Sequence, residues 1–152
     1  MENSRFCLGL DYGTNTARAL IVDASCGAEI ASGVTPYSSG QDGILADPAD
    51  PLLARQAPLD YEKALISSTR EALELLAESR GPSAKDAIIG IGIGATASTP
   101  IPVDENMRPI AQRPEFQDDL AAMAWLWKDH TAHEEADEIT RLAAQRLPQH
   151  LD

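Results

Sequence analysis

Short polar residues follow the first apolar run of the chain, and their types suit phosphate and metal chemistry. The run delivers Asp11 to its end, where a carboxylate can hold a hydrated Mg²⁺. Gly13 permits a tight turn whose N–H groups face outward, so an anion can lie against them. Thr14, Asn15 and Thr16 add side chains that can hydrogen-bond to phosphate oxygens. The segment therefore predicts a phosphate-binding turn with a carboxylate beside it.

Spacing alone leaves the role of this turn open. Arg18, which returns on the next apolar run, could add positive charge or could brace Asp11. An ordinary hairpin with a polar tip fits equally well, because short glycine motifs recur by chance. A P-loop is excluded, since no Lys-Ser/Thr follows a GxxxxG spacing.

The elements that must position this turn are short apolar runs. Residues 6–10, 17–23 and 29–34 are separated by turns containing Gly or Asp, which predicts an antiparallel meander. The polar turn lies between the first two of its strands. Residues 38–58 are rich in Pro, Gly and Asp and lack periodicity, so we expect a long surface loop there.

Helical and strand-like patterns alternate in the rest of the chain. Asp60 is a good N-cap for a helix over residues 61–80, which the Gly-Pro pair at 81–82 would end. The apolar run at 87–94 predicts a buried strand, with glycines that admit another backbone or a ligand. Two further helices are expected, at residues 116–128 and 131–146. This order indicates an α/β unit with a mixed sheet.

Composition and charge narrow the classes of function. The 152 residues suffice for one ordinary domain, and 43% hydrophobic with 24% charged residues is typical of a soluble globular protein. Acidic residues outnumber basic ones 24 to 12, so the charge of −12 disfavours nucleic-acid and acidic-membrane partners. Without a membrane-length apolar run or a signal peptide, the expected location is the cytoplasm. Cys7 and Cys26 fit two free thiols in a reducing compartment.

Four motifs, in order along the chain, carry a resemblance to a known family. The pattern Gly-x-Asp-x-Gly-Thr-x-x-x-Arg at 9–18 is similar to the first phosphate motif of the FGGY carbohydrate kinases, which are actin-like sugar kinases. Three later segments resemble the ribulokinase branch of that family: Gly-Ile-Gly-Ile at 90–93 with Thr-Ala-Ser-Thr-Pro at 96–100, Arg-Pro-Glu-Phe at 113–116, and Leu-Trp-Lys-Asp-His-Thr-Ala at 126–132. The resemblance runs from about residue 6 to residue 142. One motif alone would be weak, whereas four in order are specific.

This resemblance implies a fold and an activity. The fold would be the N-terminal domain of an actin-like (ribonuclease H-like) ATPase, an α/β domain with a mixed sheet and flanking helices. Residues 1–152 would form an incomplete part of that domain. The full-length parent would use ATP and Mg²⁺ to phosphorylate L-ribulose to L-ribulose 5-phosphate in L-arabinose catabolism. Its partner would be a ketopentose, and a homo-oligomer is compatible with the sequence.

The resemblance also assigns roles by position. Asp11 would be the carboxylate on the Mg²⁺ side. The nucleotide phosphates would be bound by residues of the first turn and the strand after it: Asp11, Gly13, Thr14, Asn15 and Arg18. The sugar would lie against residues of two later motifs: Thr96, Ala97, Trp127, Lys128 and Asp129. Trp125 and Trp127 are two positions apart and would face different sides of an expected helix, so at least one is expected in the core; Trp127 could be that residue, or it could stack on the sugar.

Two departures from the family pattern are visible. Many ribulokinases carry an acidic residue where Gly94 stands, so one polar contact of the sugar wall is expected to be missing. The family's general base and adenine-binding domain lie further along the chain, so no catalytic base is assigned and the chain alone is expected to be inactive. After Leu142 the sequence no longer resembles the family, which fits a truncated or frame-shifted gene product or an excised piece.

Other interpretations stay open. The chain could be a non-catalytic interaction module that docks onto an intact kinase, because a half-domain exposes apolar surface. A different actin-like ATPase would share the first turn but not the Trp-Lys-Asp-His segment at 127–130. His130 and His133, three apart on a helix, could reach one metal ion. No third ligand is evident, and a solvated helix start is the simpler interpretation.

Overall fold

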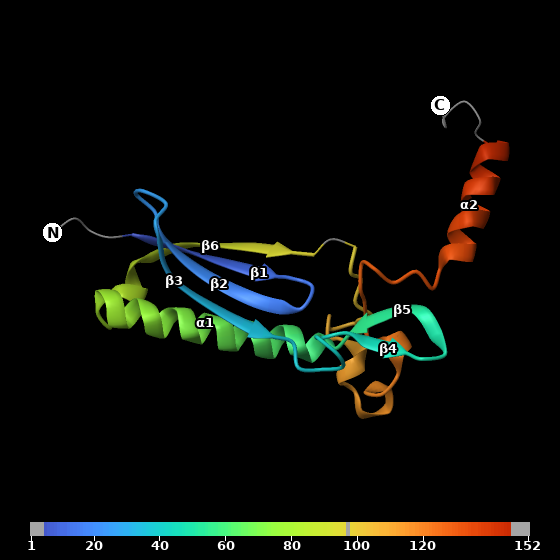
Figure 1. Cartoon of the computed structure of the whole chain (residues 1–152), viewed down its shortest axis with the longest axis horizontal. Helices are drawn as coiled ribbons and strands as arrows, with labels where there is room; N and C mark the ends of the chain where they lie inside the picture. Colours follow the sequence, from blue (N-terminus) through green and yellow to red (C-terminus); the bar gives the residue numbers. More distant parts are fainter. Residues whose placement is uncertain (1–4, 97, 147–152) are drawn as a thin grey trace.

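The computed structural model describes residues 5–96 and 98–146, and within them two sheets and two α-helices form (Figure 1). The larger sheet has the strand order β3-β2-β1-β6: β1 (Phe6–Tyr12), β2 (Thr16–Asp23), β3 (Glu29–Pro36) and β6 (Ile88–Ala95). The smaller sheet has the order β4-β5-β7: β4 (Leu45–Asp47), β5 (Asp50–Gln56) and β7 (Ala124–Trp125). The helices are α1 (Pro58–Arg80) and α2 (His133–Arg146).

The predicted meander is confirmed, and a parallel strand joins it. β1 pairs antiparallel with β2, β2 pairs antiparallel with β3, and β6 lies parallel to β1. Alternate residues of β2, Ala17, Ala19 and Ile21, are buried, as the two-residue period of a strand requires. Leu8 of β1 lies in register with Ile21 on one side and Ile91 on the other. Because β1 and β6 are parallel, their carboxyl ends meet at one edge, where α/β sheets commonly bind ligands.

Helix α1 packs closely against the meander. From Asp60 onward its buried residues recur at four-residue spacing: Asp60, Ala64, Ser68, Ala72 and Leu76. The close approach requires Gly33 of β3, since a Cβ there would lie 2.1 Å from the Ser68 carbonyl oxygen. The helix ends before Gly81, whose φ of 94° is rare for other residues.

Asp60 is not the N-cap that the sequence predicted. The helix begins at Pro58, with Ala57 as its N-cap, because a proline at this point has no N–H that needs a partner. The buried Asp60 carboxylate instead accepts hydrogen bonds from the Ser38 hydroxyl (2.9 Å) and the Ser39 N–H (2.7 Å). These hydrogen bonds connect the start of α1 to the segment that follows β3.

The surface loop predicted at residues 38–58 is wrong over its second half, where β4 and β5 form. β5 pairs with β4 on one side and, through Arg55 and Gln56, with β7 on the other. β7 lies far along the chain, so no local periodicity indicated the pairing.

The helix predicted at residues 116–128 is also wrong. The chain forms short 3₁₀ turns at Pro114–Phe116 and Leu120–Ala122 and then enters β7. The last predicted helix is confirmed as α2. None of its described residues is buried, and Figure 1 shows it extending away from both sheets.

β6 is a strand, as predicted, but it is not buried. Ile89, Ile91 and Ile93 are 57%, 65% and 71% exposed. Helix α1 packs against β1, β2 and β3, and β6 forms the outer edge of the sheet within the described residues. The apolar run thus predicted a strand correctly. Burial of that strand would need a further element packed against it, and the described residues do not supply one.

Candidate phosphate and sugar site

The turn between β1 and β2 presents free backbone donors. The Gly13 N–H donates to the Thr16 carbonyl oxygen (2.9 Å) and closes the hairpin. A Cβ on Gly13 would lie 3.2 Å from that oxygen, so the close approach favours glycine. Within residues 5–96 and 98–146, the N–H groups of Thr14 and Asn15 donate to no other group. These two amides, rather than that of Gly13, are the donors left for an anion.

The carbonyl groups of the turn fix the direction of these donors. The Gly13 carbonyl accepts from the Tyr37 hydroxyl (3.1 Å). The Thr14 carbonyl accepts from the Gln56 side-chain amide (2.7 Å). No peptide bond among the described residues is cis, and a trans peptide directs its N–H opposite to its C=O. The Thr14 and Asn15 N–H groups therefore point away from these buried partners.

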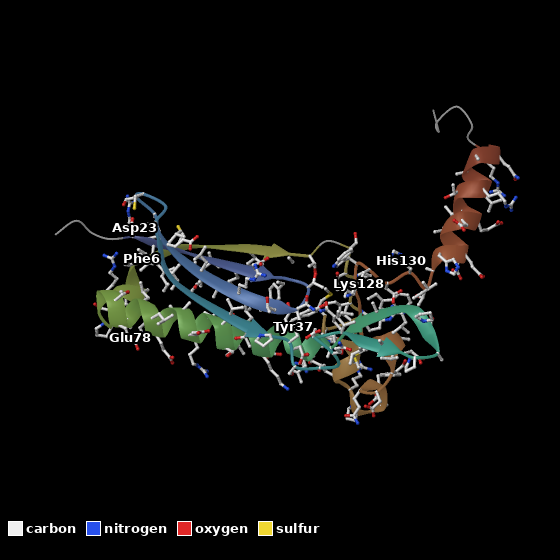
Figure 2. The ribbon with its side chains drawn as sticks, viewed as in Figure 1. Phe6, Asp23, Tyr37, Glu78, Lys128 and His130 are labelled. Carbon is white, nitrogen blue, oxygen red and sulfur yellow. The ribbon has the colours of Figure 1, made fainter. Side chains whose placement is uncertain are left out.

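Polar side chains on the protein side of the turn hold it in place through hydrogen bonds. The Tyr61 hydroxyl donates to Gln56 Oε1 (2.6 Å), and Gln56 is only 1% exposed. The rings of Tyr12 and Tyr37 each meet Tyr61 edge to face, with centroids 5.9 and 5.3 Å away. Burial raises the pKa of Tyr37 and raises the pKa of Tyr61 to about 12, so both phenols stay protonated donors at neutral pH. Figure 2 shows Tyr37 beside the start of α1, near the smaller sheet.

The side chains of the turn have different partners. Asn15 donates through Nδ2 to the Asp42 carbonyl oxygen (2.6 Å), which ties the turn to the following loop. Thr14 Oγ1 accepts from the indole Nε1–H of Trp127 (3.2 Å). A hydroxyl that accepts a hydrogen bond keeps its own proton to donate. Thr14 therefore still offers both a hydroxyl and an amide donor.

Asp11 lies at the end of β1 with an open carboxylate. Its side chain is 52% exposed, and the Arg18 guanidinium lies 3.8 Å away, a loose pair. Gly94 of β6 is in register with Asp11, and a Cβ there would lie 3.7 Å from Oδ1. Mg²⁺ is commonly held by one or two carboxylates with several waters and phosphate oxygens. An open carboxylate with room beside it fits such an ion, and Arg18 braces this carboxylate only loosely.

Thr96 follows β6 at the same edge of the sheet. Its N–H donates to the Tyr12 carbonyl oxygen (3.0 Å), which brings it next to the turn. A cavity of about 470 Å³ opens there between the sheet and α1, with mainly apolar walls. Residues with polar side chains also contribute to its lining: Tyr12, Tyr61, Glu62, Thr96, Thr99 and Gln112. Ala97, the other residue predicted here, lies outside the described residues.

A tight turn carries the other three of the five residues predicted on the sugar side. The Asp129 N–H donates to the Leu126 carbonyl oxygen (2.8 Å), which closes the turn around Trp127 and Lys128. Trp127 is 53% exposed, so a ring face is accessible beside its bond to Thr14. Lys128 is half-buried, and Figure 2 shows it beyond the end of the large sheet, near the smaller sheet.

Asp129 is engaged with the protein itself. Its side chain is 6% exposed and accepts from the Arg55 guanidinium, the Ala54 N–H (2.7 Å) and the Thr131 hydroxyl (2.6 Å). The Arg55 guanidinium lies 3.7 Å from the centroid of the Trp125 ring. Trp125 is thus a packing residue, and the sugar contact of Asp129 stays a prediction.

Sequence reasoning missed three residues that hold this site: Tyr37, Arg55 and Gln56. Arg55 and Gln56 fall in the segment predicted as a loop, so no pattern marked them as buried. Their partners Asp129 and Thr14 lie 74 and 42 residues away. Pairings of that range leave no local signal.

The structure bears on the remaining expectations. His130 lies in the turn before α2 and therefore shares no helix face with His133. No group of three or more His, Cys, Asp or Glu side chains suited to a metal occurs in the part of the chain that the structure describes. Cys7 is half-buried and Cys26 is exposed, and both are free thiols. None of the described helices combines the length and apolarity needed to cross a bilayer.

Curated ribulokinases are similar to this chain, although no family model matches it. The ribulokinase of Vibrio parahaemolyticus is 41% identical over 136 residues, which is 90% of this chain and 23% of that protein. The ribulokinase of Shouchella clausii is 39% identical over 146 residues, which is 93% of this chain and 25% of that protein. The chain thus spans about a quarter of these relatives, and the resemblance to the ribulokinase branch is confirmed.

Solved structures show the fold. A gluconate kinase from Lactobacillus acidophilus superimposes with a TM-score of 0.64 and 16% identity over 94% of this chain and 24% of its own. Plasmodium falciparum glycerol kinase with ADP gives 0.57 and 17% over 91% of this chain and 23% of its own. The predicted actin-like sugar-kinase fold, α/β with a mixed sheet, is therefore confirmed.

Proposed function

We propose that the chain supplies the phosphate side and part of the sugar side of a ribulokinase. The whole enzyme would transfer a phosphoryl group from MgATP to L-ribulose in the L-arabinose catabolism of the cytoplasm. Residues 1–152 would be part of its N-terminal domain. The observation that carries this proposal is the hydrogen bond from Trp127 to Thr14, because it joins the motif expected to meet the sugar to the one expected to meet phosphate.

The residues divide the chemistry by position. The N–H groups of Thr14 and Asn15 would hold phosphate oxygens, since donors fixed in advance need no reorganisation during the reaction. Asp11 would hold hydrated Mg²⁺, which when bound neutralises phosphate charge. The exposed ring face of Trp127 would lie against the sugar, and Thr96 would offer it a hydroxyl.

These residues do not include a base for the attacking hydroxyl. Phosphoryl transfer depends mainly on positioning and charge neutralisation, and a carboxylate usually orients the attacking group. We assign no such carboxylate among the residues proposed for this site, because Asp11 would face the metal side and Asp129 is held by Arg55. The chain alone should therefore show no ATP- and L-ribulose-dependent release of ADP.

A chimaera tests the proposal. Residues 6–142 would replace the matching quarter of the Vibrio parahaemolyticus ribulokinase, and ADP release would be measured with L-ribulose, gluconate and glycerol. We expect activity with L-ribulose, and Asp11→Asn should reduce kcat by about 100-fold, as losses of charge-stabilising groups commonly do. Asp104→Asn, which alters a carboxylate paired with Arg113, is the matched control.

The outcomes separate the parts of the proposal. A folded chimaera that prefers another sugar would contradict the substrate, and one that is inactive with every sugar would contradict the site. Equal activity of the Asp11→Asn and Asp104→Asn chimaeras would contradict the proposed role of Asp11 in holding Mg²⁺.

A second candidate function rests on the exposed edge of the large sheet. The isoleucines of β6 stand open to solvent, and such patches often mark interaction surfaces. The chain could then act as a non-catalytic module that binds an intact kinase. Co-purification of the tagged chain with a full-length ribulokinase, abolished by Ile91→Lys, would favour this function over the first.

A further inference from the structure

Strand β5 contacts both halves of the candidate site through two adjacent residues. Gln56 donates to the Thr14 carbonyl on the phosphate side. Arg55 pairs with Asp129, which closes the turn that carries Trp127. Neighbouring residues of a strand point to opposite faces, so one short strand can hold two separate segments.

The Arg55–Asp129 pair is buried and fully partnered. The two side chains are 4% and 6% exposed, and a charged pair at such depth is tolerated only when its other polar atoms are also satisfied. Arg55 Nε donates to the Leu120 carbonyl (3.2 Å), and Nη2 lies 3.5 Å from the Thr131 hydroxyl oxygen. No buried side-chain nitrogen or oxygen lacks a partner among the described residues. The pair therefore has one well-defined geometry.

Strand β5 is hydrogen-bonded to both ends of the turn that carries Trp127. The Ala54 carbonyl accepts from the Leu126 N–H (3.1 Å), and the Ala54 N–H donates to Asp129 Oδ2 (2.7 Å). Trp127 lies between these anchors. Among the described residues, the hydrogen bond of its indole N–H goes to Thr14. The position of its ring thus depends on how firmly the turn is held.

We propose that Arg55 and Asp129 are positioning residues that hold the Trp127 indole against Thr14. In this way they set the spacing between the sugar side and the phosphate side. Their importance for catalysis rests on the proposed function, whereas the geometry is a property of the chain itself. The inference gives Asp129 a role other than direct contact with the sugar.

Nuclear magnetic resonance of the ¹⁵N-labelled 152-residue chain tests this geometry without any ligand. The two indole N–H signals are assigned with Trp125→Phe and Trp127→Phe, and Thr14→Val gives the signal of a Trp127 indole without its acceptor. The test variants are Asp129→Asn and Arg55→Lys. Asp104→Asn is the control, because Asp104 also pairs with an arginine but does not touch this turn.

We expect both test variants to move the Trp127 indole signal toward its Thr14→Val position. Exchange of that proton with water should become about three- to tenfold faster, the effect of losing one modest hydrogen bond. The control Asp104→Asn should change neither the position of the Trp127 indole signal nor the exchange rate of its proton. An unmoved Trp127 signal in a folded Asp129→Asn chain would overturn the proposal, since a pair that merely stabilises the fold would lower stability without moving the indole.

A milder variant covers the case in which the charged variants fail to fold. Thr131→Val removes the hydroxyl that Asp129 Oδ1 accepts from (2.6 Å) but leaves no charge unpaired. A shift of the Trp127 signal in the same direction supports the proposal, and no shift overturns it. Because no nucleotide or sugar is present, a failure of the proposed kinase function would leave these results unaffected.

Discussion

Replacing Gln56 by methionine should lower the free energy of unfolding of the chain. Gln56 is 1% exposed, and its side chain bonds the Thr14 carbonyl (2.7 Å) and the Tyr61 hydroxyl (2.6 Å). Methionine fills nearly the same volume, so little of the effect comes from a cavity. The loss should arise from the groups left without this partner, which also include the Gly43 carbonyl oxygen (3.4 Å).

The magnitude follows from those orphaned groups. Each buried polar group that loses its partner costs about 1–3 kcal/mol. The Tyr61 hydroxyl can recover part of its loss with water, so we expect Gln56→Met to lower the free energy of unfolding by about 2–4 kcal/mol. Against a total of about 5–15 kcal/mol for an ordinary domain, this is a large share.

Urea unfolding followed by far-ultraviolet circular dichroism measures this change. Gln117→Met is the control, because Gln117 is exposed and should change the free energy of unfolding by no more than about 0.5 kcal/mol. If Gln56→Met also stayed within about 0.5 kcal/mol of the parent chain at unchanged m-value, the argument that Gln56 holds the turn would be refuted.

Further predictions concern packing, association and pH. Gly33→Ala should destabilise the chain by several kcal/mol in the same urea assay, because its Cβ would lie 2.1 Å from the Ser68 carbonyl oxygen. Gly92→Ala should change the free energy of unfolding much less, because a Cβ there would have open space around it. The chain should self-associate in sedimentation velocity, and Ile91→Lys should shift it toward monomer, since that side chain is 65% exposed; equal association of both chains would contradict this. Burial raises the pKa of Tyr61 from 10.0 to about 12, so the folded state holds its proton more tightly and stability should fall as the pH rises from 10 to 12. Tyr61→Phe should flatten that fall, and an unchanged profile would contradict the assignment.

The sequence predicted the part of the fold that local patterns determine. Alternating burial along Ala17, Ala19 and Ile21 matches the two-residue period of a strand, and the apolar runs gave the meander and β6. The polar turn at Thr14 and Asn15 was predicted from residue types at the end of β1. These features depend on neighbours within a few positions, which is why the sequence shows them.

The rest depends on distant partners. Arg55 lies in a segment without periodicity, and its burial is explained by partners far along the chain, among them Asp129 and Trp125. The helix predicted around Trp125 failed because β7 pairs with β5, which local propensity does not record. The isoleucines of β6 are the opposite case, because they were expected to be buried and are exposed. An apolar run predicts a strand, but the burial of that strand depends on what packs against it.

The central claim is that the N–H groups of Thr14 and Asn15 form a phosphate site beside Asp11. The most direct measurement is a titration of the ¹⁵N-labelled chain with magnesium tripolyphosphate, which needs no adenine site. We predict that the Thr14 and Asn15 amide signals move most, and that Asp11→Asn weakens the response while Asp104→Asn does not. Amide signals that stay fixed at saturating triphosphate, or that move mainly elsewhere in the chain, would contradict the account.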